Sequence, residues 1–330
     1  MFRRDQDRGS EFASDERIQH LVERDTPVLD VPDHIYGLGG AGTRMVLEIF
    51  HQDWFVVEAL KGRNRPVQVH LIDTATEGED NVEEEIQTLD ERTSQLEQRY
   101  RSNNPEETVG TVSFSQYNIN TNLTVRSWDD LVGERTVETI LDEPRLGVDE
   151  WWLKKRHLRS PNDPSNLFQI SNGVIKRRAL SKALHYKCRV SDDRNYRDEF
   201  QTNNDEDRIA IFSSLGGGTG SGLCIDVARE IYTQNEAAQI HLFATLPAPE
   251  EQEVSLKNTY AALGELEYLH LSERENPFNQ LFLFSLEPTE HDTEATSSAD
   301  VLEFDATLPY VLTSVYNRTD ADLALSETKS

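Results

Sequence analysis

Hydrophobic and polar positions along the chain fall into blocks that predict strands and helices in turn, and one block organises the rest. Residues 209–212 form an apolar, β-branched run that is typical of a buried strand. Seven small residues, GGGTGSG, follow at 216–222. Beyond them, apolar residues recur at helical spacing: Leu223, Val227, Ala228 and Ile231. The stretch 207–233 therefore predicts a strand, a glycine loop and a helix, which together turn backbone N–H groups toward an anion.

A second block of the same kind lies near the N-terminus. A short strand is predicted at 34–36, and the residues GLGGAGT at 37–43 come directly after it. A helical pattern follows at Met45, Val46, Ile49 and Phe50. Gly37, Gly39 and Gly42 satisfy G-x-G-x-x-G, but this motif by itself does not identify the ligand, because several phosphate-binding folds share it.

The remaining blocks predict a chain in which strands and helices alternate. Further strands are expected at 67–72, 239–246 and 280–286, with a β-like run at 111–117. Further helices are expected at 81–100, after a turn at Ser171, at 255–270 and at 300–316. Pro309 in the last of these predicts either a kink or the true first turn of a helix. The fold class is therefore α/β: a Rossmann-like, largely parallel sheet with helices on both faces and ligand at the C-terminal edges of the strands.

Polarity divides the chain into an extension and a domain. Residues 1–33 are highly charged, with a modest helical pattern at Ile18, Leu21 and Val22, and predict a partly helical N-terminal extension. Residues 34–330 predict a nucleotide-binding domain with an insertion at about 101–170. The insertion holds the pair Trp151-Trp152 and a dense basic cluster: Lys154, Lys155, Arg156, His157 and Arg159. This cluster either faces a nucleotide or an acidic partner, or is a solvated helix face.

Charge narrows the setting in which the protein works. The net charge is −27, from 60 acidic and 33 basic residues, so the surface repels nucleic acid and anionic membranes. Concentrated salt screens such repulsion, and the composition therefore predicts a very salty cytoplasm, as in a halophilic archaeon. The cysteines, Cys188 and Cys224, lack metal-ligand or disulfide spacing, and neither a signal peptide nor an apolar run of membrane-spanning length is present, so a cytoplasmic location is expected.

The two glycine loops, with the strands and helices around them, resemble those of the tubulin/FtsZ superfamily. GGGTGSG resembles the signature loop of that family, and GLGGAG resembles its first phosphate loop. A P-loop is excluded, because no Lys-Ser or Lys-Thr pair follows the last glycine. The resemblance runs unevenly from about Ile35 to the C-terminus and corresponds to the nucleotide-binding half of such proteins.

The resemblance implies GTP or GDP with Mg²⁺ as ligands, and it implies a set of nucleotide-binding residues. These are Gly37, Gly39, Gly40, Ala41, Gly42, Thr43, Arg44, Asp73, Thr74, Gly216, Gly217, Gly218, Thr219, Gly220, Ser221, Gly222, Glu251 and Phe304. Thr219 and Ser221 would supply hydroxyl donors at the mouth of the loop, Glu251 would bind ribose, and Phe304 would stack on the base. Asn172, Gly173, Arg177 and Arg178 are further candidates for capping the terminal phosphate.

Three positions have more than one interpretation. Asp73 and Thr74 end the second strand. An acid at this position binds ribose in a dinucleotide fold, and it lies beside phosphate and metal in the tubulin/FtsZ family. The alternative is a loop acid or a helix cap. Arg44 replaces the asparagine that is usual in the family, and it either pairs with phosphate or ribose or lies on the helix surface. The guanine-reading asparagine is also absent, since Glu287-Pro288 follows the strand at 280–286.

Three functions follow from these observations. The first is a GTP-binding, tubulin-like protein of the cytoskeletal or assembly type, which self-associates into filaments or oligomers. The chain ends at Ser330, before the family's second domain and water-activating loop, so slow hydrolysis is expected and no catalytic residue is assigned. The second is a Rossmann-type NAD(P)-binding oxidoreductase, which would not need the second glycine loop. The third is a non-hydrolysing scaffold with a degenerate nucleotide site.

Overall fold

The computed structural model describes residues 22, 28–75, 79–119, 124–125, 168–169, 174, 176–190, 194–202, 206–248, 251–272, 276–285 and 298–317. The strands of its main sheet are β1 (His34–Leu38), β2 (Val67–Asp73), β3 (Val112–Asn118), β6 (Arg208–Ser214), β7 (Gln239–Thr245) and β8 (Gln280–Phe284). Its helices are α2 (Gly39–Phe50), α3 (Asp53–Leu60), α4 (Glu79–Asn103), α8 (Arg178–Val190), α9 (Arg194–Asp198), α10 (Thr219–Gln234), α11 (Glu253–Ser272), α12 (Ser298–Asp305) and α13 (Leu308–Tyr316). A separate antiparallel pair joins β4 (Thr124–Val125) to β5 (Phe168–Gln169).

All six strands of the main sheet are parallel, and their order is β3-β2-β1-β6-β7-β8. Counted along the sheet this is 3-2-1-4-5-6, the order of doubly wound α/β proteins. The chain runs outward from β1 in one direction and then from β6 in the other, so the topological switch point lies between these two strands. The predicted α/β fold with a parallel sheet is confirmed.

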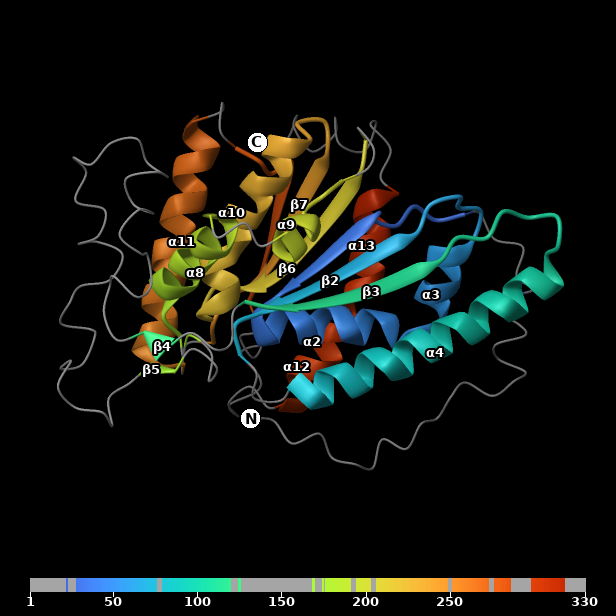
Figure 1. Cartoon of the computed structure of the whole chain (residues 1–330), viewed down its shortest axis with the longest axis horizontal. Coiled ribbons are helices and arrows are strands. Elements are labelled where there is room, and N and C mark those ends of the chain that lie inside the picture. The colour runs from blue at the N-terminus through green and yellow to red at the C-terminus, as the bar shows by residue number, and fades with distance from the viewer. Residues whose placement is uncertain are drawn as a thin grey trace, which may run out of the picture.

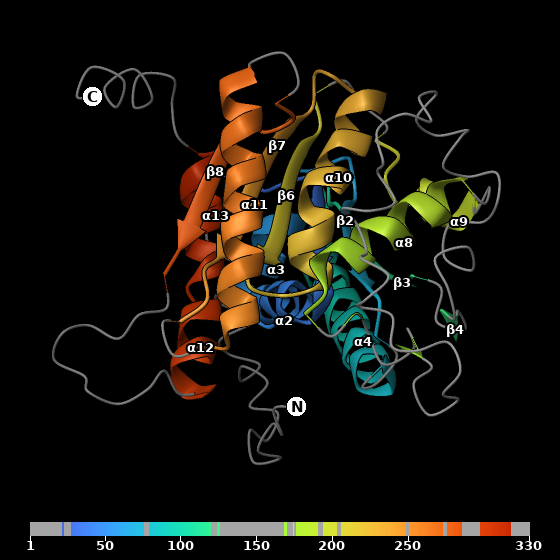
Figure 2. The ribbon, with the colours of Figure 1, turned by 90° about the vertical axis from the view of Figure 1, so that its left-hand side faces the viewer.

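Helices cover both faces of the sheet, as Figures 1 and 2 show. On one face α2, α3, α4 and α13 pack over a core that includes Ile35, Ala210 and Phe212. On the other face α8, α10 and α11 pack over a core that includes Tyr36 and Ile211. Neighbouring residues of one strand therefore enter opposite cores, because side chains alternate along a strand. β1 is buried at all five positions, as expected for a central parallel strand.

The N-terminal and insertion boundaries differ from the pattern seen in the sequence. Val22 and Val31 are buried in the core beside α2 and α3, so parts of the expected extension pack against the domain. Residues 101–103 complete α4, and the β-like run is β3, an edge strand of the main sheet. The part of the expected insertion up to residue 119 therefore belongs to the main fold. The basic cluster at 154–159 and the pair Trp151-Trp152 lie outside the described residues.

Pro309 marks the first turn of a helix rather than a kink inside one. The pattern at 300–316 forms two helices, α12 and α13, and the proline occupies one of the first two positions of α13. A proline is tolerated there because the N–H that it lacks would have no partner within the helix. Within the described part of the chain, no helix combines the length and apolarity needed to cross a membrane.

Candidate functional site

The first glycine loop begins α2 directly after β1. Leu38 caps α2 without a side-chain hydrogen bond, and no acid lies in the first turn of the helix. Gly39 has a φ of +70°, in the left-handed region where a side chain would be strained. The N-terminal N–H groups of α2 thus have neither a capping side chain nor a neutralising carboxylate. That combination suits an anion.

The second glycine loop begins α10 after β6 in the same manner. Gly218 is the N-cap of α10, makes no side-chain cap bond, and no acid lies in the first turn. Since β1 and β6 are hydrogen-bonded neighbours, both helices start at the same edge of the sheet, on either side of the switch point. Two positive helix ends therefore lie together, where doubly wound folds bind their ligands.

Several of the glycines are required by the packing of the two loops on each other. A Cβ atom on Gly39 would lie 2.9 Å from the backbone nitrogen of Gly220, and a Cβ on Gly220 would lie 2.6 Å from the carbonyl oxygen of Leu38. A Cβ on Gly42 would overlap the carbonyl oxygen of Phe212 on β6. These glycines are explained by backbone contacts inside the protein.

The other glycines of the two loops fall into two groups, according to whether the protein leaves space for a side chain. Side chains on Gly37, Gly218 or Gly222 would meet backbone atoms or buried side chains at less than 3 Å, and a side chain on Gly216 would press on Pro247 and Ser255 at 3.2 Å. Gly40 and Gly217 differ from these. The nearest atom to a Cβ would be Asp73 Oδ2 at 3.8 Å for Gly40 and the Ser214 carbonyl oxygen at 3.5 Å for Gly217. A methyl group would have room at both positions among the described residues, so the packing of the loops on each other does not require glycine there.

Asp73 and Thr74 lie at the C-terminal tip of β2, next to the first turn of α10. The hydroxyls of Thr74 and Thr219 are 2.7 Å apart, and Thr219 also hydrogen-bonds the Asp73 carboxylate. Asp73 accepts a further bond from the backbone N–H of Thr74 at 2.6 Å. Burial raises the pKa of Asp73, although these hydrogen bonds oppose the shift. A partly exposed carboxylate therefore adjoins both glycine loops.

The sequence pattern predicted that the hydroxyls of Thr219 and Ser221 both lie at the mouth of the second loop. The structure instead buries both side chains. Thr219 is 8% exposed and its hydroxyl is held by β2, while Ser221 is fully buried. Ser221 Oγ has no hydrogen-bond partner among the described residues, and its backbone carbonyl accepts a bond from Arg178 Nε at 3.0 Å. Ser221 faces inward because the first turn of α10 packs against the start of α8, where Ser181 Oγ donates to the carbonyl of Gly218.

A third part of the chain, Val174 and residues 176–178 at the start of α8, lies beside the second glycine loop. The backbone N–H of Val174 points at Thr74 Oγ1 at 3.3 Å, and Lys176 has a φ of 56°. Lys176 Nζ donates to Ser255 Oγ at 2.7 Å and lies 3.4 Å from Glu251 Oε2. The amide of Asn258 donates to the carbonyls of Lys176 and Gly217 at 2.8 and 3.0 Å. The start of α8 and the second glycine loop are thus joined through α11.

Sequence reasoning missed Lys176, Ser255 and Asn258 as members of this arrangement. No local pattern marks them, since each is an ordinary polar residue in a turn or a helix. Of the candidates for a phosphate cap, Arg177 is exposed, while Arg178 is turned away into a two-pronged pair with Glu265 of α11, at 2.8 and 2.7 Å. Asn172 and Gly173 lie outside the described residues.

Three further predicted site residues lie on two different sides of the glycine loops: Glu251 on one side, and Arg44 and Phe304 on the other. Glu251 is exposed beside Lys176, on the side of α11. Arg44 lies on α2 and pairs through Nε with Asp305 of α12, whose side chain is fully buried. Phe304, on the same helix, packs on Phe284 at the end of β8, with ring centroids 5.3 Å apart. Arg44 thus has a partner within the protein, Asp305, that the sequence did not predict.

The described residues contain no group of three or more His, Cys, Asp or Glu side chains that could hold a metal by themselves. Asp73 is a single carboxylate beside the loops. Mg²⁺ in nucleotide sites is commonly held by one or two carboxylates, phosphate oxygens and waters. The donor set therefore fits a cation that arrives with a phosphate ligand.

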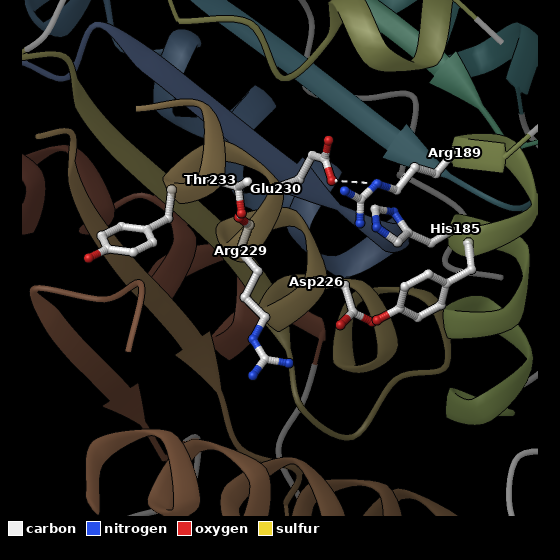
Figure 3. Close-up of a pocket in the computed structure, with 8 residues that line it drawn as sticks. His185, Arg189, Asp226, Arg229, Glu230 and Thr233 are labelled. Carbon is white, nitrogen blue, oxygen red and sulfur yellow. Dashed lines mark hydrogen bonds and ion pairs between the residues drawn. The ribbon is translucent and has the colours of Figure 1, made fainter. Parts of the chain in front are cut away.

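A cavity of about 320 Å³ lies apart from these loops, between α8 and the later turns of α10 (Figure 3). Its lining is His185, Tyr186, Arg189, Asp226, Arg229, Glu230, Tyr232 and Thr233. Its carboxylates are already paired, Asp226 with Lys182 at 2.8 Å and Glu230 with Arg189 at 3.0 Å. None of the predicted site residues lines it.

The parallel sheet in the 3-2-1-4-5-6 order, with a glycine loop on each side of the switch point, makes this chain a doubly wound α/β protein. Residues 175–303 match the family model described as "Tubulin like". This segment contains α8, the second glycine loop, α10 and α11. The resemblance to the tubulin/FtsZ superfamily that the sequence indicated is supported over these residues.

Solved structures with a similar chain course share little sequence with this protein. They include CetZ2 from Haloferax volcanii, a GTPγS-bound protofilament, at 12% identity and a TM-score of 0.46, covering 89% of this chain and 61% of that one. They also include an empty FtsZ dimer from M. jannaschii, at 14% identity and a TM-score of 0.44, covering 89% and 59%. TubZ from Bacillus thuringiensis serovar israelensis, a GTPγS-form protofilament, matches at 12% identity and 0.43, covering 92% and 61%. The chain thus spans less than two thirds of these proteins, and no curated protein matches it.

Proposed function

We propose that this protein binds GTP or GDP at the paired glycine loops and works as a tubulin-like protein of the cytoskeletal or assembly type. The observation that carries the proposal is the meeting of two uncapped helix N-termini at the switch point, with Gly40 and Gly217 open toward the outside. The guanine base is taken from the tubulin/FtsZ resemblance, which the match over 175–303 supports.

The phosphates would lie against the first turns of α2 and α10. Neither turn carries an acid, so no carboxylate of the turns themselves competes with the anion for the backbone N–H groups. Gly40 and Gly217 allow the phosphate oxygens to approach the backbone within hydrogen-bond distance. The ammonium of Lys176 lies beside the same loop, where it bonds Ser255.

Mg²⁺ would enter with the phosphates and be held from the protein side by Asp73. Burial raises the pKa of Asp73, and a divalent cation beside this carboxylate would offset the cost of keeping it charged. Ribose would be bound by Glu251, and the base would stack on Phe304. Both assignments come from the resemblance, and together they would set the orientation of the bound nucleotide.

Self-association into filaments or oligomers follows from the same resemblance, with hydrolysis completed by a second subunit. GTP hydrolysis needs a water positioned opposite the leaving group, and in this family a neighbouring subunit supplies the residue that does so. A salt-rich cytoplasm, as in a halophilic archaeon, is the proposed setting. Both cysteines are buried and neither forms a disulfide, which is compatible with a reducing compartment.

The test is nucleotide binding by calorimetry in multimolar KCl with Mg²⁺, comparing GTP, ATP and NAD. The variants are Gly40→Ala and Gly217→Ala, because the protein has room for each methyl group. Gly264→Ala is the matched control, since Gly264 lies in α11 with nothing within 4 Å of its Cβ position. We expect GTP to bind, each loop variant to weaken binding at least tenfold (about 1.4 kcal/mol), and the control to bind as the wild type does.

Other results would favour the other functions. Binding of NAD in place of GTP would support a Rossmann-type oxidoreductase, because the strand order is shared with dinucleotide-binding folds. A folded protein that binds none of the three nucleotides would support a scaffold. If ATP bound and the loop variants lost that binding, the proposed site would be retained and the base would be adenine instead of guanine.

A further inference from the structure

One helix of this acidic protein has an exposed face that is apolar over most of its length. The exposed positions of α11 include Tyr260 at 83%, Leu271 at 74%, Tyr268 at 66% and Leu256 at 44%. They follow one another at intervals of three to eight residues, so they lie on one side of the helix. The buried side of the same helix carries Ala262, Leu266 and Leu269. We call the exposed set, with Gly264 between the two tyrosines, the α11 stripe.

The α11 stripe differs from the other long surface helix of the protein. α4 exposes mainly charged and amide side chains and keeps only a thin buried stripe, as a solvated helix does. In Figure 2, α11 runs down the front of the molecule, and no described helix or strand lies across it. A chain of net charge −27 thus exposes two tyrosines and two leucines on a single helix face. Contiguous apolar surface of this kind marks an interaction site.

The order of the residues in the stripe is nearly symmetric about Gly264. Tyr260 and Tyr268 lie four residues on either side of it, and Leu256 and Leu271 lie eight and seven residues away. When two such helices pack antiparallel about a two-fold axis at Gly264, each Tyr260 comes beside Tyr268 of the second copy. Each Leu256 then comes beside Leu271 of the second copy. An isologous interface requires this kind of self-complementarity.

Gly264 would be the point of closest approach in that arrangement. It is exposed in the interior of a helix, where glycine costs about 1 kcal/mol relative to alanine. No atom of the described residues lies within 4 Å of its Cβ position, so their packing does not require a glycine. A glycine at the centre lets two helix backbones come close, while the flanking tyrosines close over the contact.

The available area suits a modest dimer. At about 200 Å² for an aromatic side chain, the exposed parts of the two tyrosines offer roughly 300 Å² per copy. With the leucines and neighbouring residues, two copies would bury on the order of 1,000 Å², the lower limit for a specific interface. The exposed charges on this side of the helix are Glu253 and Lys257, which pair with each other at one end, and Glu267, which lies between the two tyrosines in the sequence.

We propose that this protein forms a two-fold symmetric dimer in which the α11 stripes of two copies pack antiparallel about Gly264. The contact is independent of the glycine loops and needs no nucleotide. Because both copies are strongly acidic, concentrated KCl tightens the dimer by screening their repulsion.

The first test is sedimentation of the nucleotide-free chain over a range of concentrations in 0.1 M and 2 M KCl. We expect a monomer–dimer equilibrium that strengthens with salt. The double variant Tyr260→Asp/Tyr268→Asp should raise the dissociation constant at least 100-fold. Tyr310→Asp is the control, because Tyr310 is an exposed tyrosine of α13 on the other face of the sheet and should leave the dimer intact.

The register is tested by disulfide cross-linking, with both native cysteines buried. Gly264→Cys should cross-link to itself under mild oxidation. Tyr260→Cys and Tyr268→Cys should cross-link when mixed with each other, and much more slowly when each is alone. A monomer at all concentrations, a dimer insensitive to the tyrosine changes, or a different cross-linking pattern would overturn the proposal.

Failure of this proposal can be told apart from failure of the nucleotide site. Gly217→Ala should leave the dimer unchanged even where it abolishes GTP binding. Association that requires GTP and disappears in Gly217→Ala would belong to the nucleotide site, and would overturn the α11 dimer.

Discussion

The hydroxyl groups of Thr74 and Thr219 lie 2.7 Å apart and join the tip of β2 to the first turn of α10 across 145 positions of sequence. Both residues are buried, and Thr219 also hydrogen-bonds the Asp73 carboxylate. The contact ties the carboxylate that we assign to Mg²⁺ to the loop that we assign to phosphate. It holds the two halves of the doubly wound sheet in register on either side of the switch point.

Replacing Thr219 with valine should therefore destabilise the fold. The change removes one of the two partners of the Thr74 hydroxyl and one hydrogen bond of Asp73, and we expect a loss of about 1–3 kcal/mol in the free energy of unfolding. Thr233→Val on the same helix is the control, since Thr233 is exposed and bonds only a backbone carbonyl of its own helix. Denaturant unfolding of the two variants measures the difference. Equal stability of the two variants would contradict the assigned role of the contact.

Two glycines in the same loop should respond to alanine in opposite ways. Gly220→Ala places a methyl group against the Leu38 carbonyl and Ser213 Oγ, each 2.6 Å away, so the loops must separate. We expect a loss of more than about 3 kcal/mol or a failure to fold. Gly217→Ala has room and should keep its unfolding free energy within about 1 kcal/mol of wild type. Thermal unfolding distinguishes the two, and a Gly217→Ala variant that also unfolds would remove its use as a binding test.

The His241 ring should make stability depend on pH. Burial lowers its pKa to about 4, and its Nδ1 has no hydrogen-bond partner among the described residues. As the pH falls below about 6.5, an unfolded histidine takes up a proton while the folded one does not, so stability is lost down to about pH 4. At about 1.4 kcal/mol per unit of pKa, the loss is on the order of 3 kcal/mol.

The variant His241→Phe isolates that contribution. Phenylalanine preserves the stack on Tyr316, whose ring lies parallel at 5.0 Å, and it cannot be protonated. We expect the unfolding free energy of His241→Phe to fall less than that of wild type between pH 7 and pH 4.5, at constant high KCl. Parallel curves for the two proteins would show that His241 is already protonated, or accessible, in the folded state.

A buried ion pair should hold α8 to α10 beside the cavity of Figure 3. The Lys182 and Asp226 side chains are 10% and 3% exposed, and Lys182 Nζ lies 2.8 Å from Asp226 Oδ2. Lys182→Met leaves the Asp226 carboxylate buried without its cation, which costs about 3 kcal/mol. Lys257→Met removes the exposed partner of Glu253 and should change stability little in dilute solution. Chemical denaturation of both variants checks this, and equal effects would contradict the assignment.

Much of the fold could be read from local patterns in the sequence. The apolar run at 209–212, the run at 67–72 and the helical spacing after each glycine loop all correspond to elements of the structure. They do so because the burial of a strand, or of one face of a helix, determines the spacing of apolar residues within a short segment. The alternation of these elements gave the parallel sheet, and the glycine loops gave the two helix starts at its edge. The run at 111–117 was also predicted as β-like, but its local pattern does not show that it joins the main sheet as the edge strand β3.

The sequence by itself determined where the strands, the helices and the two glycine loops lie, since these depend on the spacing of apolar residues and on the freedom of glycine. Only the tertiary structure decided what each glycine does: Gly39, Gly42 and Gly220 serve the packing of one loop on another, whereas Gly40 and Gly217 leave space. It likewise decided that Asn258 fastens the second loop and that Arg44 pairs with Asp305. Such contacts join residues that are far apart in the chain. The packing of the helices on the assembled sheet, rather than any local pattern, brings these residues together.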